Sequence, residues 1–203
     1  MNETSSTATS QPAPAPPGQT VRVDLSRFAN PEFDRGAGML KEALWLVIRQ
    51  VLFLGCPFSF SALKCGVLRA FGAKIGKGVT IKPGVKITFP WKLEVGDHVW
   101  LGEDCWLLNL DRIVIHSHVC VSQRAFLCTG SHDYRKSTFN LITLPITLDE
   151  GVWIGASAWV GPGVTARSHA LLTAGSVTGK NLPAWGIYQG NPAVKVRERR
   201  MRE

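Results

Sequence analysis

The stretch from 148 to 177 decides the fold. It consists of five consecutive six-residue units, LDEGVW, IGASAW, VGPGVT, ARSHAL and LTAGSV. Each unit begins with an apolar residue and carries a small or β-branched residue at its fifth position. In an extended segment the first and fifth side chains point the same way, and a turn, often with glycine, then starts a new face. Three faces close a triangular coil of about eighteen residues, and stacked coils bury one apolar column.

The same six-residue period occurs upstream in three shorter registers, which begin at Ile75, Val95 and Ile115. A helical period is absent there, and a repeat of this kind governs the fold before local propensity does. The sequence therefore predicts an all-β parallel β-helix over 72–177. The apolar anchors expected to point inward are Ile75, Ile81, Ile87, Val95, Leu101, Leu107, Ile113, Ile115, Val121, Leu127, Leu148, Ile154, Val160, Ala166 and Leu172.

Segments of other character flank the repeat. Residues 1–20 hold almost no large apolar side chain, so we expect a disordered tail. An N-terminal helical, capping segment is expected over 21–71, and a short C-terminal segment over 178–203. Segment 39–60 lacks glycine and proline until Gly55, which predicts a helix that ends near Leu54.

Segment 39–60 is also the most apolar part of the chain. A bilayer span needs about 20 apolar residues, and Arg49 and Gln50 interrupt the run, so a spanning helix is not expected. Two interpretations stay open: packing of the helix on the main domain, and a peripheral contact of 44–60 with a membrane.

Composition narrows the function classes. The formal charge of +8 includes five basic residues among the last nine, and no aromatic-interleaved basic stripe of the nucleic-acid-binding kind occurs. The five cysteines form no Cys-x-x-Cys pair, which predicts free buried thiols in a reducing compartment. The first residues lack the features of a secretory signal, so a cytoplasmic location is expected.

The repeat breaks between Leu127 and Leu148, which are 21 residues apart. A loop over 128–147 must therefore leave the coil, and loops on rigid scaffolds commonly carry the chemistry. This loop contains Thr129-Gly130-Ser131-His132-Asp133. Acyl transfer to a hydroxyl needs a base that is effective near neutral pH, and histidine suits that task. His132 is the candidate base.

Further motifs surround that loop: Val152-Trp153-Ile154-Gly155, Pro162-Gly163-Val164 and Gly190-Asn191-Pro192-Ala193. Together with the TGSHD segment they resemble the hexapeptide-repeat sugar O-acetyltransferases, and most closely the colanic acid biosynthesis acetyltransferases. The similarity covers roughly Asp24 to Arg199. It implies that the β-helix is left-handed, since parallel crossovers are otherwise almost always right-handed.

The resemblance also implies roles for single residues. His132 would be the general base in a direct transfer of an acetyl group from acetyl-CoA to a sugar hydroxyl, and Asp133 would orient its ring. The positions that match coenzyme A contacts in the family are Ala156, Ala174, Gly179, Lys180 and Arg197. The acceptor contacts of related maltose and galactoside enzymes do not align with the segment from Trp106 to Asp111.

The partners that the resemblance implies are a sugar or lipid-linked sugar of exopolysaccharide or lipopolysaccharide biosynthesis and two further copies of the chain in a homotrimer. A lipid-linked acceptor would bring the enzyme to the inner face of the cell membrane through 44–60. Nucleic acid is not expected as a partner.

Two alternatives share the fold, a zinc-dependent carbonic anhydrase and a catalytically silent scaffold. His116, His118 and Cys120 alternate like a ligand set. Because Ile115, Val119 and Val121 take the inward positions, no metal is expected there.

Overall fold

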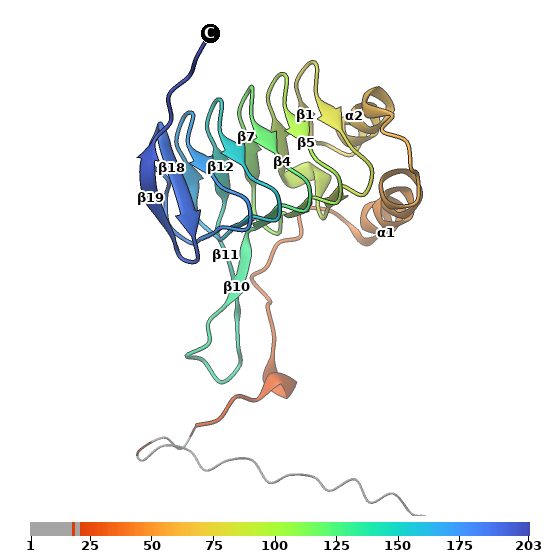
Figure 1. Cartoon of the computed structure of the whole chain (residues 1–203). Helices are drawn as coiled ribbons and strands as arrows, with labels where there is room; N and C mark the ends of the chain where they lie inside the picture. The colour runs from red at the N-terminus through yellow and green to blue at the C-terminus, as the bar shows by residue number, and fades with distance from the viewer. Residues whose placement is uncertain (1–17, 19–20) are drawn as a thin grey trace, which may run out of the picture.

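A computed structural model describes Gly18 and residues 21–203 (Figure 1). The predicted disordered tail over 1–20 therefore lies, apart from Gly18, outside the described residues. The described part is dominated by a stack of coils with helices at one end and a β-hairpin at the other (Figure 1).

Three parallel sheets form the sides of the stack. Neighbouring strands in each sheet pair in register, as Val95 does with Ile115. The first sheet contains β1 (Lys74–Ile75), β4 (Leu93–Val95), β7 (Ile113–Ile115), β12 (Ile146–Leu148) and β15 (Thr165–Ala166). The second contains β2 (Thr80–Ile81), β5 (Trp100–Leu101), β8 (Cys120–Val121), β13 (Trp153–Ile154), β16 (Leu171–Leu172), β18 (Gly186–Gly190) and the antiparallel β19 (Ala193–Glu198). The third contains β3 (Lys86–Ile87), β6 (Trp106–Leu108), β9 (Phe126–Cys128), β14 (Trp159–Val160) and β17 (Val177–Thr178).

The apolar column inside the coils is the predicted one. Every anchor of the six-residue period is buried except Ile75, which is half-buried at the first coil. The fifth positions are buried as well, among them Cys105 and Ala158. Burial raises the pKa of the Cys105 thiol to about 12, and all five cysteines are free. The period thus correctly identified which side chains form the core.

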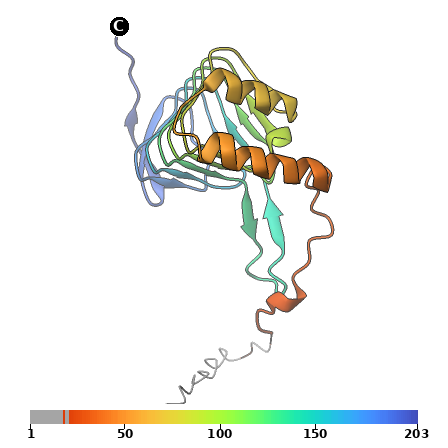
Figure 2. The ribbon, with the colours of Figure 1, turned by 90° about the vertical axis from the view of Figure 1, so that its right-hand side faces the viewer.

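Helices close the first coil. The predicted helix runs through α1 (Met39–Ile48) and continues as a π-helical turn, η2 (Arg49–Leu54), so its predicted end near Leu54 is confirmed. Helix α2 (Ser61–Ala70) follows. Trp45 and Phe53 pack into the column, and the Trp45 Nε1–H donates to the Ile87 carbonyl at 3.2 Å. Both helices lie side by side across the end of the coil (Figure 2).

Among the residues that the structure describes, no helix combines the length and the apolar character needed to cross a bilayer.

Candidate functional site

The three register shifts of the sequence all occur at one corner of the coil. The inward-facing residues of successive strands are six residues apart where the chain passes from the first sheet to the second and from the second to the third. Val95, Leu101 and Leu107 are one example. The next step, from the third sheet back to the first, is longer in the first three coils. The extra residues stack above one another, and they build the candidate site.

The largest insertion is a hairpin that leaves the stack below this corner (Figure 1). Its strands are β10 (Gly130–His132) and β11 (Leu141–Thr143), and His132 pairs directly with Leu141. Directly opposed residues of an antiparallel pair place their side chains on the same face. His132 and Leu141 therefore share one face of the hairpin.

The His132 ring is half-buried and held by the chain itself. Its Nδ1 lies 2.8 Å from the Phe139 carbonyl oxygen, and the ring stacks on Phe139 at 4.5 Å between centroids. Phe28 covers it from the N-terminal side at 5.8 Å. Since a carbonyl only accepts, Nδ1 carries a proton, and in the neutral form of the ring the lone pair is on Nε2.

Asp133 does not orient that ring. Its Oδ1 accepts the backbone N–H of Arg135 at 3.1 Å and lies 3.6 Å from the Arg135 Nε. The expected orienting role of Asp133 is thus taken by the carbonyl of Phe139, because neighbouring side chains on a strand point to opposite faces. Asp133 shapes the turn of the hairpin.

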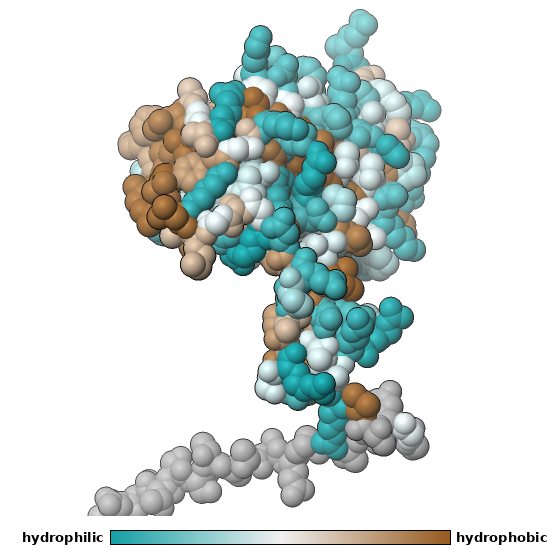
Figure 3. Space-filling view, turned by 180° about the vertical axis from the view of Figure 1, so that it is seen from behind, coloured by the Kyte–Doolittle hydropathy of each residue, from teal (hydrophilic) through white to brown (hydrophobic). Residues whose placement is uncertain are grey.

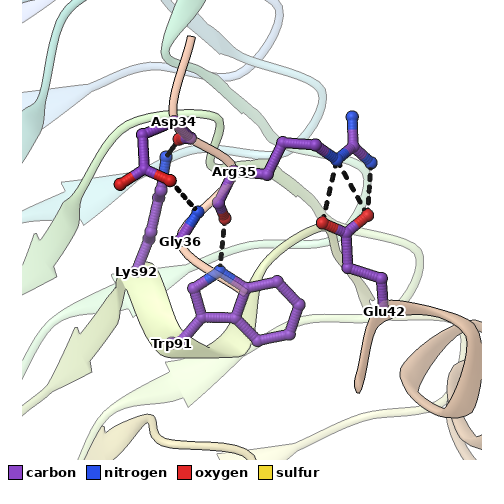
Figure 4. Close-up of polar contacts among 6 residues, drawn as sticks. All are labelled: Asp34, Arg35, Gly36, Glu42, Trp91 and Lys92. Atoms are coloured by element: carbon purple, nitrogen blue, oxygen red, sulfur yellow. Dashed lines mark hydrogen bonds and ion pairs between the residues drawn. The ribbon is translucent and has the colours of Figure 1, made fainter. Parts of the chain in front are cut away.

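An N-terminal arm over 24–36 crosses the hairpin, and its position could not be read from the sequence. The backbone N–H of Asp24 donates to Ser137 O at 2.8 Å, and Asn30 Oδ1 accepts the N–H of Leu141 at 3.1 Å. Figure 4 shows where the arm reaches the first inserted turn, η3 (Pro90–Lys92). There Trp91 Nε1 donates to the Arg35 carbonyl at 2.6 Å.

A polar cavity of about 510 Å³ lies between arm, hairpin and inserted turns. Lys92 lines this cavity, and its Nζ donates to the carbonyl of Asp34 at 2.5 Å (Figure 4). The same Nζ donates to the carbonyl of Leu110 at 2.7 Å. Burial lowers the pKa of Lys92, and the carboxylates of Asp111 and Asp34 partly oppose that shift. The other lining residues include Glu32, Phe33, Lys136, Asn140, Leu141 and Thr143.

Asn109 precedes Leu110, which lines this cavity, but its own side chain forms hydrogen bonds inside the coil. It is fully buried, and its Oδ1 accepts the backbone N–H groups of Thr88 and Phe89, each at 3.0 Å. Its Nδ2 donates to the Phe89 carbonyl at 2.5 Å. The amide thus supplements the ladder hydrogen bond from the Thr88 N–H to Leu107 O where the chain of the first coil bulges out, and its full burial keeps it away from a ligand.

A second cavity, of about 390 Å³, crosses the outer face of the second sheet. It brings together three residues expected at a coenzyme A site, Ala156, Ala174 and Arg197. At Gly155, in its floor, an added Cβ would lie 2.5 Å from the Ala174 backbone nitrogen. The other lining residues are Ser122, Gln123, Trp153, Leu171, Leu172, Thr173 and Ile187.

Gly179 and Lys180 do not line that cavity. They follow β17 on the third sheet, where the Lys180 N–H donates to Thr178 Oγ1 at 3.2 Å, and both residues are exposed. Within one copy of the chain, Gly179 and Lys180 therefore lie apart from Arg197, although the sequence predicted all three for the same coenzyme A site.

The remaining histidines gather at other turns. His98 stacks on His118 at 5.4 Å, and His116 Nε2 lies 4.0 Å from Asp149 Oδ1. Within the described residues, no three His, Cys, Asp or Glu side chains are grouped as a metal site would need.

Known proteins resemble the chain in sequence and in fold. The chain is 43% identical over 176 residues to WcaF of Escherichia coli (strain K12), which is named as a colanic acid biosynthesis acetyltransferase; the match covers 87% of this chain and 97% of WcaF. No family model matches the sequence.

Two solved structures share the fold. One is the hexapeptide-repeat acetyltransferase VCA0836 of Vibrio cholerae O1 biovar eltor complexed with acetyl coenzyme A, with a TM-score of 0.73, 22% identity and coverage of 87% of this chain and 97% of that chain. The other is a galactoside acetyltransferase in complex with coenzyme A, with a TM-score of 0.70, 20% identity and coverage of 78% and 80%. The predicted left-handed parallel β-helix is confirmed.

Proposed function

The chain belongs to the hexapeptide-repeat acetyltransferases of the colanic acid biosynthesis type, and from this we propose that it moves an acetyl group from acetyl-CoA to a sugar hydroxyl of an exopolysaccharide or lipopolysaccharide precursor. The observation that carries the proposal is the His132 ring, whose Nδ1 donates to the Phe139 carbonyl on the hairpin whose residues Asn140 and Leu141 line a polar cavity. Acetyl-CoA is the cosubstrate, and the reaction takes place in the cytoplasm.

His132 acts as the general base. With its Nδ1–H donated to Phe139, its Nε2 takes the proton of the sugar hydroxyl as that oxygen attacks the thioester carbonyl. The tetrahedral oxyanion collapses, the C–S bond breaks, and the proton on Nε2 passes to the leaving thiolate. The acetyl group moves directly, without an acyl-enzyme. Asp133 supports the turn that carries the ring rather than the ring itself.

The reaction is tested by measuring CoA release from acetyl-CoA with a panel of sugar acceptors. Release that depends on one acceptor supports the proposal. A scaffold without activity would bind no acetyl-CoA in calorimetry, and a carbonic anhydrase would contain zinc and hydrate carbon dioxide. Either of those results would replace the proposal.

The cavity on the second sheet is the proposed site for coenzyme A. The small side chains of Ala156 and Ala174 leave room for a pantetheine chain beside the backbone, and Arg197 at the rim faces the place of the nucleotide phosphates. Gly179 and Lys180 stay outside this cavity in one chain, so we propose that they act at its margin or from a neighbouring copy.

Replacing Arg197 with alanine is expected to weaken acetyl-CoA binding about tenfold or more, since a charge-assisted hydrogen bond to phosphate is lost. Calorimetry with acetyl-CoA measures the effect. Binding of acetyl-pantetheine, which lacks the nucleotide, should stay unchanged, and Arg200→Ala is the matched control outside the cavity. Equal losses for both ligands would remove Arg197 from phosphate binding.

The polar cavity beside the hairpin is the proposed acceptor site. His132 shares a hairpin face with Leu141, which lines this cavity, and carboxylates in the wall suit sugar hydroxyls. Asp111 uses its Oδ1 to accept the Arg112 N–H at 2.6 Å, which leaves its second oxygen for a ligand.

Asp111→Asn is accordingly expected to raise the KM of the sugar about tenfold, because an amide N–H₂ cannot accept a hydroxyl proton as the carboxylate does. Steady-state kinetics with varied sugar measures this, with the acetyl-CoA affinity as internal reference. Asp97→Asn is the matched control, since Asp97 also accepts one backbone N–H, at 2.7 Å from Lys77, but lies at a different corner. An unchanged KM in Asp111→Asn would place the sugar elsewhere.

A homotrimer completes the proposal. The hairpin that carries His132 and the coenzyme A cavity lie on different sides of the coil. In a trimer, the hairpin of one copy would therefore bring its His132 to the coenzyme A cavity of a neighbouring copy. The outer face of the third sheet supports such packing, because Trp106 stacks on Phe126 at 4.6 Å and Trp159 pairs with Phe126 in register. The mass in solution by light scattering tests it, with a monomer as the contradicting result.

A further inference from the structure

Helix α1 and its continuation η2 are apolar on two opposite faces. One face, with Trp45 and Phe53, is buried against the first coil. The other carries a row spaced like one stripe of a helix, and its members are exposed: Leu40 to 85%, Leu44 to 52%, Val47 to 62% and Val51 to 67%. A surface helix normally presents polar residues on its outer side, so a second apolar stripe on that side indicates a second partner.

The exposed apolar area extends beyond the helix. Phe58 and Phe60 lie in the following loop with their rings 5.4 Å apart, and Leu63 of α2 is next to them in sequence; all three are more than half exposed. The space-filling view shows apolar side chains gathered over the helical end of the molecule, with polar side chains around them (Figure 3). A contiguous apolar surface of this kind marks an interaction site.

The positive charge of the helical end of the molecule indicates a negatively charged partner. The segment 39–88, which forms both helices and the first coil, contains eight lysines and arginines and a single acidic residue, Glu42. That carboxylate is already paired with Arg35 at 2.6 Å (Figure 4). Seven of the eight net positive charges of the chain thus lie in this quarter of the sequence.

Several of these basic side chains are exposed beside the helices. Arg69 of α2 donates to the carbonyls of Ile75 and Gly76 and so joins α2 to the first coil, whose turns carry the exposed Lys77 and Lys82. Lys64 is the exception, since it is fully buried and donates to the Phe58 and Lys82 carbonyls at 3.2 and 3.4 Å.

We propose that the helical end docks on the surface of an anionic lipid bilayer, with the row from Leu40 to Val51 and the two phenylalanines inserted at the level of the headgroups. The lysines of the first coil then face the lipid phosphates. Apolar side chains with a basic surround are the composition of helices that lie in a membrane interface, and juxtamembrane basic residues are attracted by anionic leaflets. A second copy of the chain would bring the same positive charge and is disfavoured by repulsion.

Sedimentation with vesicles tests the proposal on the full-length protein, without acetyl-CoA or sugar, so its outcome is independent of the proposed reaction. The vesicles contain phosphatidylcholine with an equal share of phosphatidylglycerol, or phosphatidylcholine alone. We expect binding to the anionic vesicles that weakens by about tenfold or more without phosphatidylglycerol or at high salt, as electrostatic attraction requires.

The variant Leu44→Gln/Val47→Gln/Val51→Gln is expected to lower the partition coefficient about tenfold or more, because three inserted side chains become polar. Val194→Gln/Val196→Gln is the matched control: these exposed valines of β19 lie in the hairpin at the opposite end of the stack, and binding should not change. Circular dichroism verifies the fold of both proteins.

A second variant, Lys77→Gln/Lys82→Gln, keeps the test valid if the apolar variant does not fold, and it should weaken binding to anionic vesicles by about tenfold at low salt. Absence of wild-type binding, or binding by both variants at the wild-type level, would overturn the proposal. A wild-type self-association that the apolar variant abolishes, with no binding to vesicles, would overturn it in favour of a second copy.

Discussion

Replacing His132 with alanine is expected to lower the rate of acetyl transfer by about 10²-fold or more, the range for loss of a general base. The Nε2 atom is the proposed proton acceptor, and no other histidine lies on the hairpin. The measurement is CoA release with saturating acetyl-CoA and the accepting sugar. The acetyl-CoA dissociation constant should remain the same, because the ring lies outside the lining of the cavity on the second sheet.

His116→Ala serves as the matched control, since His116 is an exposed histidine whose only described ionic partner is Asp149. It should keep the wild-type rate. If His132→Ala retains full activity, the base lies elsewhere. If both variants lose activity together, a general effect on folding explains the loss, and melting curves would show it.

Asn109→Ala is expected to lower the free energy of unfolding by about 2 kcal/mol, because the buried N–H of Phe89 loses its described hydrogen-bond partner at a cost of roughly 1–3 kcal/mol. The Thr88 N–H and the Phe89 carbonyl, which also bond to Asn109, keep a second partner each, Leu107 O at 3.2 Å and the Lys92 N–H at 2.9 Å. Urea unfolding followed by circular dichroism measures the change.

The matched control is Asn181→Ala. Asn181 is exposed, and its Oδ1 accepts one backbone N–H, that of Thr165, at 2.8 Å. Water can replace that partner, so a loss of about 1 kcal/mol or less is expected. A stable Asn109→Ala protein that has lost affinity for the sugar would contradict the structural role of Asn109 and assign it to the acceptor.

The sequence predicted the column of the β-helix because its signal is local and repeated. Leu107 and Val160 are inward-facing for the same reason, a fixed spacing within a flat strand, and no contact across the chain is needed to see it. The end of the N-terminal helix at Leu54 was predictable from Gly55 for a similar reason. Handedness required a resemblance, since the period is the same in either hand.

The surroundings of His132 could not be predicted in this way. Phe139 holds the ring through its backbone carbonyl. Because every residue has such a carbonyl, the identity of residue 139 does not predict this contact. Asn30 reaches Leu141 across 111 positions of sequence. The separation of Lys180 from Arg197 also depends on which sheet each segment joins, and β19 returns antiparallel outside the repeat.

All inserted residues lie at one corner of the coil, so the parts of the chain that keep the scaffold in register are separate from the parts that form the candidate site. Two corners keep constant spacing, so every coil re-enters the ladder in the same register whatever happens at the third. In a solenoid each coil depends mainly on its neighbours, and a change of length at that corner is therefore not transmitted along the axis. Descendants of such a chain can lengthen, shorten or exchange these loops and acquire new acceptors while they inherit an unchanged scaffold.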